Sequence, residues 1–168
     1  MGNSRLHPKK SKMNKHLYTY FLVFLFSITA NAQEKTIISF QTKNGKTMKL
    51  SLRQKDNAII YRLYNKDKIE MQYPKIPSIS ENKNFSFTYL NRFGGNINEA
   101  TSVYRVEFFI NNYRYSVFQS SYLGKNESGI SVLDLNNSKV TEIKAVEKTV
   151  NGSLLYFKDN QLITVTEL

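Results

Sequence analysis

The side chains that could do chemistry in this 168-residue chain are few. Both histidines, His7 and His16, lie near the N-terminus, and there is no cysteine. From residue 33 onward the sequence therefore offers no Ser-His-Asp or Cys-His nucleophile and no histidine or thiolate metal site. Paired carboxylates, a Ser–Lys pair, or tyrosine and lysine acid–base groups remain. We expect a protein that is not an enzyme and that binds no cofactor and no metal.

Two patterns match the chemistry that remains. Ser80-Glu81-Asn82-Lys83 fits the S-x-x-K arrangement of Ser–Lys acyl enzymes, but the S-D-N and K-T-G elements that accompany it are absent from the sequence. Glu70 and Glu107 stand in predicted strands, and glycoside hydrolysis needs two carboxylates about 5–10 Å apart. Both share a strand face with Gln72 or Arg105, which is typical of an ion-paired, solvated sheet surface. A carboxylate hydrolase is therefore the distant alternative.

Two other segments are candidates for binding. The first is a loop in which adjacent glycines let the backbone approach a partner closely. This loop contains Arg92, Phe93, Gly94, Gly95 and Asn96. The second is a basic face in the first predicted hairpin, which suits a polyanion or protects strand edges. This face contains Lys43, Lys46, Lys49, Arg53 and Lys55.

Residues 1–32 have the pattern of a secretory signal peptide. Lysines at positions 9, 10, 12 and 15 precede an uncharged apolar run over residues 17–29. Ala30 and Ala32 place small residues before a cleavage point that makes Gln33 the first mature residue. As a helix the run spans about 20 Å, less than the ~30 Å hydrocarbon core, so we expect cleavage rather than a transmembrane anchor. Residues 1–12 are an upstream extension if translation starts at Met13.

Cleavage changes the charge of the protein. The full chain has 24 Lys and Arg against 13 Asp and Glu, a formal net charge of +11. The leader contains five basic and no acidic residues, which leaves the mature chain with a net charge of +6. We expect a periplasmic or secreted protein whose partner is another protein or a cell-envelope polymer, and not nucleic acid.

After the leader, short alternating segments are separated by Asn, Asp and Gly turns such as Asn44-Gly45 and Asn111-Asn112. The predicted strands are residues 36–42, 46–53, 58–64, 68–73, 85–91, 102–110, 113–122, 129–134, 140–144, 153–158 and 161–166. This pattern predicts one all-β domain over residues 33–168. We expect an antiparallel meander barrel of about 8–10 short strands, with a β-sandwich as the alternative.

Several short segments of the chain together resemble a known protein family. They are Tyr61-Arg62-Leu63-Tyr64, Lys68-Ile69-Glu70 with Tyr73-Pro74, Arg92 through Asn96, Tyr113-Arg114-Tyr115, Ser128-Gly129-Ile130-Ser131-Val132, and Gly152-Ser153-Leu154. Through them, residues 58–167 resemble a family of small, exported, uncharacterised bacterial all-β proteins. The resemblance implies a secreted or periplasmic β domain and brings no activity, substrate or catalytic residue.

In architecture and size, the predicted domain is also loosely similar to the periplasmic lysozyme-inhibitor barrels. It departs from them in having no cysteine for their usual disulfide and in being basic, whereas a cationic lysozyme favours an acidic partner. We expect a non-enzymatic binding module, inhibitor-like or immunity-like towards a protein or an envelope polymer. A structural envelope protein with its basic face on anionic lipid or polymer is the alternative.

Overall fold

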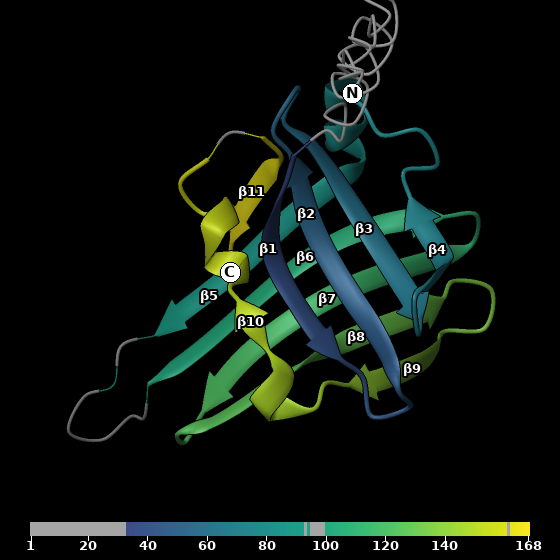
Figure 1. The fold of residues 1–168 in the computed structure, drawn as a ribbon. Helices are drawn as coiled ribbons and strands as arrows, with labels where there is room; N and C mark the ends of the chain where they lie inside the picture. Colours follow the sequence, from purple (N-terminus) through teal and green to yellow (C-terminus); the bar gives the residue numbers. More distant parts are fainter. Residues whose placement is uncertain (1–32, 93, 95–99, 161) are drawn as a thin grey trace, which may run out of the picture. The chain divides into compact units, whose positions relative to one another are not determined.

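Five strands form the first sheet, in the order β10-β1-β2-β3-β4 (Figure 1). In β2, Met48, Leu50 and Leu52 are buried and alternate with residues on the other face, as in a strand with one face towards a core. β1 to β4 pair as antiparallel hairpins, and the short β10 joins the free edge of β1. The strands are β1 (Glu34–Gln41), β2 (Lys46–Arg53), β3 (Ala58–Asn65), β4 (Lys68–Tyr73) and β10 (Asn151–Gly152).

The computed structural model describes residues 33–92, 94, 100–160 and 162–168. Its second sheet has six strands in the order β11-β5-β6-β7-β8-β9. β5 to β9 form an antiparallel meander, whereas β11 adds parallel to the outer edge of β5. The strands are β5 (Phe85–Arg92), β6 (Thr101–Ile110), β7 (Tyr113–Tyr122), β8 (Lys125–Asp134), β9 (Lys139–Lys144) and β11 (Thr164–Glu167).

Three short 3-10 helices connect the strands: η1 (Ile79–Asn84), η2 (Glu147–Thr149) and η3 (Leu154–Phe157). η1 links β4 of the first sheet to β5 of the second sheet. No helix in the described part of the chain is both long and apolar enough to cross a membrane.

The core lies between the two sheets, whose strands cross at a steep angle in Figure 1. Tyr61 of β3 contacts Phe108 of β6 across the interface, with ring centroids 5.0 Å apart. Leu154 and Phe157 of η3 are buried in the same cluster. All members of the cluster belong to Gln33–Leu168, so this unit contains a hydrophobic core of its own.

The predicted all-β class is confirmed. In the described residues the strands divide between two sheets and do not pair into a closed barrel, so the arrangement is closer to the sandwich alternative. An isolated bridge between Thr42 and Ala145 ties one end of the first sheet to the second. Of the expected cleavage-site residues, Ala30 and Ala32 lie outside the described part of the chain, and Gln33 is exposed just before β1.

Two details of the C-terminal region differ from the sequence-based prediction. Residues 153–158 were expected to form a strand, but Leu154 and Phe157 are three residues apart and both buried, a spacing that suits one helical turn. The Ser153 hydroxyl caps this turn by accepting a hydrogen bond from the Leu155 backbone N–H at 3.2 Å. The last strand begins at Thr164 rather than 161 and pairs parallel, not antiparallel.

Candidate functional site

The inner face of the second sheet changes from apolar to polar along its strands. One register row across β5 to β8 is fully apolar and buried: Phe87, Val106, Val117 and Ile130. The next two rows on the same face bear hydroxyl and amide groups. They are Tyr89, Tyr104, Gln119 and Ser128, followed by Asn91, Ser102, Ser121 and Asn126. We call these eight residues the polar rows.

The polar rows line a pocket of about 600 Å³. All of their residues except Tyr89 and Asn91 contribute to it. The other side is formed by Lys43, which follows β1, and by the segment between β9 and η3. Hydrogen bonds hold these parts together: the Lys43 N–H donates to the Lys144 carbonyl at 2.9 Å, and the Val146 N–H donates to the Gln41 carbonyl at 2.7 Å. Pockets of roughly 300–1,000 Å³ accommodate ligands the size of a drug molecule.

Some polar groups of the pocket are already engaged in the fold. The Gln119 side-chain oxygen accepts a hydrogen bond from the Leu154 N–H at 2.6 Å, which fixes η3 over the sheet. The Tyr104 hydroxyl donates to the Asn91 side-chain oxygen at 2.7 Å. Ser121 and Asn126, by contrast, have no side-chain hydrogen bond to another described residue, and both line the pocket.

The charges around the pocket balance. The Lys144 ammonium contacts a Glu127 carboxylate oxygen at 2.9 Å. The hydrogen bond from Lys144 to Glu127 and the attraction between their charges raise the pKa of Lys144 above its ordinary value, so this lysine stays cationic. Lys43 and Glu147 add one charge of each sign to the lining. The pocket therefore combines neutral polar groups with equal numbers of cations and anions.

The predicted loop Arg92–Asn96 starts at the pocket end of the sheet. Arg92 is the last residue of β5 and pairs with Thr101, one position beyond the outer polar row. Arg92 and Gly94 are exposed. Phe93, Gly95 and Asn96 lie outside the described residues.

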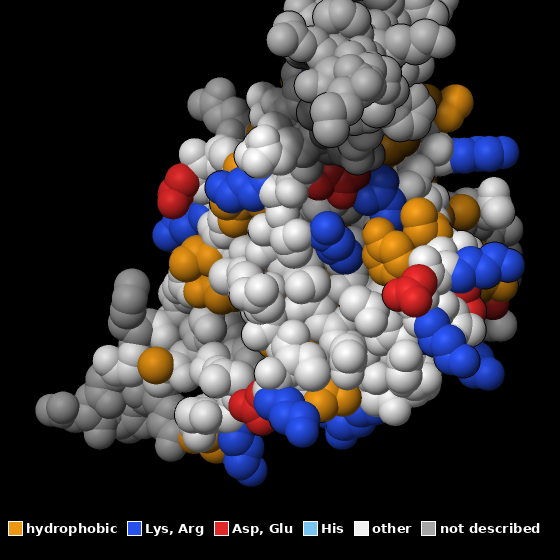
Figure 2. Space-filling view, viewed as in Figure 1, with side chains coloured by type: hydrophobic (Ala, Val, Ile, Leu, Met, Phe, Trp, Pro, Cys, Tyr) orange, Lys and Arg blue, Asp and Glu red, His pale blue; other side chains and the backbone are white. Residues whose placement is uncertain are grey.

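The predicted basic face is not one cluster. Lys43 and Lys55 occupy turns at opposite ends of β2, an eight-residue strand that spans roughly 26 Å. Lys46 is paired with Glu70 on β4, and Arg53 with Asp56 in the β2–β3 turn. Lys49 lies in the middle of β2, and only Lys43 of the five lines the pocket. On the face seen in Figure 2, Lys and Arg side chains are scattered among acidic and neutral ones.

The residues considered for catalysis are not brought together. Glu70 belongs to the first sheet, where Lys46 and Asn65 bind its carboxylate. Glu107 belongs to the second sheet, on the side opposite to Phe108, and accepts a hydrogen bond from the Ser116 hydroxyl at 2.7 Å.

In the S-x-x-K segment, the Ser80 hydroxyl is 2.8 Å from the Ser78 hydroxyl. Within this described segment, no hydrogen bond joins Ser80 to Lys83. Over the described residues, no group of three or more acidic or histidine side chains is placed to hold a metal ion.

No sequence motif marks the pocket, although the strands contain a usable pattern. The alternation that predicts buried apolar residues continues along each strand, but with polar residues at the inward positions. In β6, Val106 is apolar and inward, and the polar Tyr104 and Ser102 share its face. Gln119 and Ser121 follow Val117 in the same way in β7. An inward polar position in a strand indicates either an edge or a pocket, and only the neighbouring strands distinguish the two.

Comparisons of this chain with protein-family models, with curated proteins and with solved structures found no match. The resemblance to small exported bacterial proteins stays a prediction.

Proposed function

We propose that the mature domain is an exported, non-enzymatic binding module that holds a saccharide segment of a cell-envelope polymer in the pocket. The polar rows support this proposal. Hydrogen-bonding side chains occupy inward positions of the three neighbouring strands β6, β7 and β8 and face an open pocket instead of the core. A core would bury apolar groups at these positions, because an unpaired buried polar group is costly.

The chemistry of the lining suits a neutral, hydroxyl-rich ligand. Serine hydroxyls and asparagine amides each provide both donors and acceptors, which matches the mixed donor and acceptor surface of a sugar. Tyr104 adds an aromatic ring, which lies nearly parallel to Phe87 at a centroid distance of 6.4 Å. The balanced charges of Lys43, Lys144, Glu127 and Glu147 do not favour a strongly anionic polymer.

Binding rather than catalysis is favoured by the state of the charged groups. Lys144 is engaged with Glu127, and its raised pKa makes it a poor general base near neutral pH. Arg92, the first residue of the predicted loop, pairs with Thr101, which is next to the pocket residue Ser102.

The test is binding of the purified mature domain to an array of neutral and amino-sugar oligosaccharides, followed by calorimetry on those that bind. We expect at least one oligosaccharide to bind, and Ser121→Val and Asn126→Leu each to weaken binding roughly tenfold through loss of a hydrogen bond. Ser131→Val is the matched control, because Ser131 lies on β8 outside the pocket lining. Absence of binding, or equal affinity in the wild type and both pocket variants, would contradict the proposal.

A further inference from the structure

At one end of the first sheet, a short loop exposes two isoleucines. The loop of residues 74–78 joins β4 to η1. Ile76 in this loop is 80% exposed, and Ile79 at the start of η1 is 56% exposed. Lys75 and Lys83, on either side of them in the sequence, are exposed as well. Two large aliphatic side chains are thus presented to solvent among lysines.

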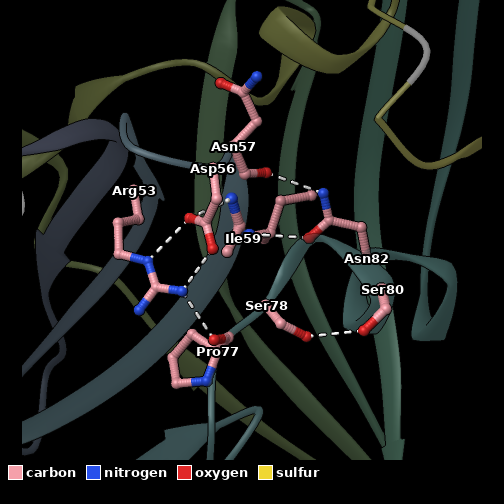
Figure 3. A network of polar contacts seen from close by, with 9 residues as sticks. Arg53, Asp56, Asn57, Ile59, Pro77, Ser78, Ser80 and Asn82 are labelled. Carbon is pink, nitrogen blue, oxygen red and sulfur yellow. Dashed lines mark hydrogen bonds and ion pairs between the residues drawn. The ribbon is translucent and has the colours of Figure 1, made fainter.

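A polar network anchors the loop that contains Ile76, and Figure 3 shows its contacts at Arg53, Pro77 and Asn82. The Arg53 guanidinium donates to the Pro77 carbonyl at 2.7 Å and binds both carboxylate oxygens of Asp56, at 2.8 and 2.6 Å. The Gln72 side chain donates to the Lys75 carbonyl at 3.2 Å. The loop is therefore anchored on both sides of Ile76.

The same network joins η1 to the β2–β3 turn. The buried Asn82 side chain accepts a hydrogen bond from the Ile59 N–H and donates one to the Asn57 carbonyl, both at 2.9 Å. This contact places Lys55, an exposed residue of that turn, at the same end of the domain as Ile79. Figure 1 shows η1 and the β2–β3 turn at one end of the first sheet.

The chain also enters the domain at this end. The Gln33 carbonyl accepts a hydrogen bond from the Gln54 N–H at 2.9 Å, and Glu34 pairs with Arg53. Gln33, the first described residue, therefore lies at the same end of the domain as Lys55.

We propose that this end of the domain docks on the surface of an anionic lipid bilayer. Ile76 and Ile79 would enter the boundary between headgroups and acyl chains. Anionic headgroups would attract Lys55, Lys75 and Lys83. Charge complementarity supports this partner, because the mature chain has a net charge of +6. The inference does not depend on the pocket, but the two are compatible: Lys43 lines the pocket at the opposite end of β2, so a docked domain would present the pocket away from the lipid.

The experiment is co-sedimentation of the domain Gln33–Leu168 with vesicles of phosphatidylglycerol and phosphatidylcholine, and with vesicles of phosphatidylcholine alone. We expect binding to the anionic vesicles that falls as salt is raised. Ile76→Ser/Ile79→Ser should abolish most of it, and Lys75→Gln/Lys83→Gln should weaken it about tenfold. Phe109→Ser and Lys139→Gln are matched controls, since both residues are exposed on the second sheet, and they should bind like the wild type.

A second measurement uses the absence of tryptophan from the chain. Ile76→Trp introduces a single indole, whose emission should shift to shorter wavelength with anionic vesicles and be quenched by brominated lipid. The indole of Phe109→Trp should show neither effect. No sedimentation of the wild type, an unshifted emission from the Ile76→Trp variant, or self-association through the isoleucines without vesicle binding would overturn the proposal.

Discussion

The rings of Phe108 and Tyr73 lie almost parallel, with centroids 4.6 Å apart and an interplanar angle of 11°. Phe108 belongs to β6 of the second sheet and Tyr73 to the last position of β4 in the first. Phe108 also stacks on Tyr115 of the neighbouring strand at 5.4 Å. One phenylalanine therefore joins the two sheets and links adjacent strands within its own sheet.

Replacing Phe108 by alanine should lower the free energy of unfolding by about 3–5 kcal/mol, because a fully buried ring is lost between two sheets. Its neighbour Phe109 provides the control, since it points to the other face and is 52% exposed. Phe109→Ala should cost less than about 0.5 kcal/mol. Urea unfolding of the three proteins measures both values, and equal costs at the two positions would contradict the assigned strand faces.

Asn82→Ala should destabilise the domain by about 2 kcal/mol, because it leaves the Ile59 N–H and the Asn57 carbonyl without their partner in a buried site. Asn84→Ala is the matched control: its side chain is exposed and donates a hydrogen bond to Glu81 at 2.8 Å. Thermal unfolding followed by circular dichroism compares the variants. A similar loss for both would show that Asn82 does not have the anchoring role inferred from its contacts.

A polar network crosses the outer side of the first sheet. The Arg62 guanidinium donates to both carboxylate oxygens of Glu34, at 2.9 and 2.7 Å, and to the Gln72 side chain at 2.7 Å. Burial of Glu34 disfavours its charged form, but the hydrogen bonds from Arg62 and Ser51 and the charges of Arg62 and Lys49 outweigh it. The pKa of Glu34 therefore lies below its ordinary value of 4.5.

This lowered pKa makes stability depend on pH. The stabilisation from Glu34 should be complete above its unfolded-state pKa near 4.5 and be lost as the pH falls through the lower folded-state value. Glu34→Gln should cost about 1 kcal/mol at pH 7, and the difference from the wild type should shrink at more acidic pH. Urea titrations at a series of pH values measure this. A difference between Glu34→Gln and the wild type that does not change with pH would contradict this prediction.

Gly152→Ala should destabilise the contact between β10 and β1 by about 2–3 kcal/mol. Gly152 has a φ of +93°, and an added Cβ would collide with the backbone carbonyl of Ile37. Gly45 has a φ of +82° but open space around it, so Gly45→Ala should cost only the backbone strain, about 1–2 kcal/mol. Chemical unfolding of both variants separates the steric effect from the conformational one.

The second and fourth predicted strands, residues 46–53 and 68–73, have the bounds of β2 and β4. Period-two alternation and the flanking Asn, Asp and Gly turns are local properties, and they suffice for hairpins. η3 could not be predicted in this way. Its residues Leu154 and Phe157 have no extended apolar period, and they are helical because both reach the core between the sheets.

In the candidate site, too, some features follow from local sequence patterns and others depend on the tertiary structure. Ser102 lies 19 residues before Ser121, and neither these two residues nor Asn126 belong to a recognisable motif. Their common position in one register row depends on how β6, β7 and β8 pair. Of the loop predicted for binding, Arg92 lies at the pocket end of the sheet, and the binding role of the loop stays a prediction.

The sequence by itself determined the all-β class, most of the strands and a composition poor in catalytic side chains, because alternation, turn residues and residue counts do not depend on distant contacts. Only the tertiary structure decided that the strands divide between two sheets, that β11 runs parallel to β5, and that polar side chains from several strands line one pocket. These features arise from strand pairing and from packing of residues far apart in the chain, which no local pattern specifies.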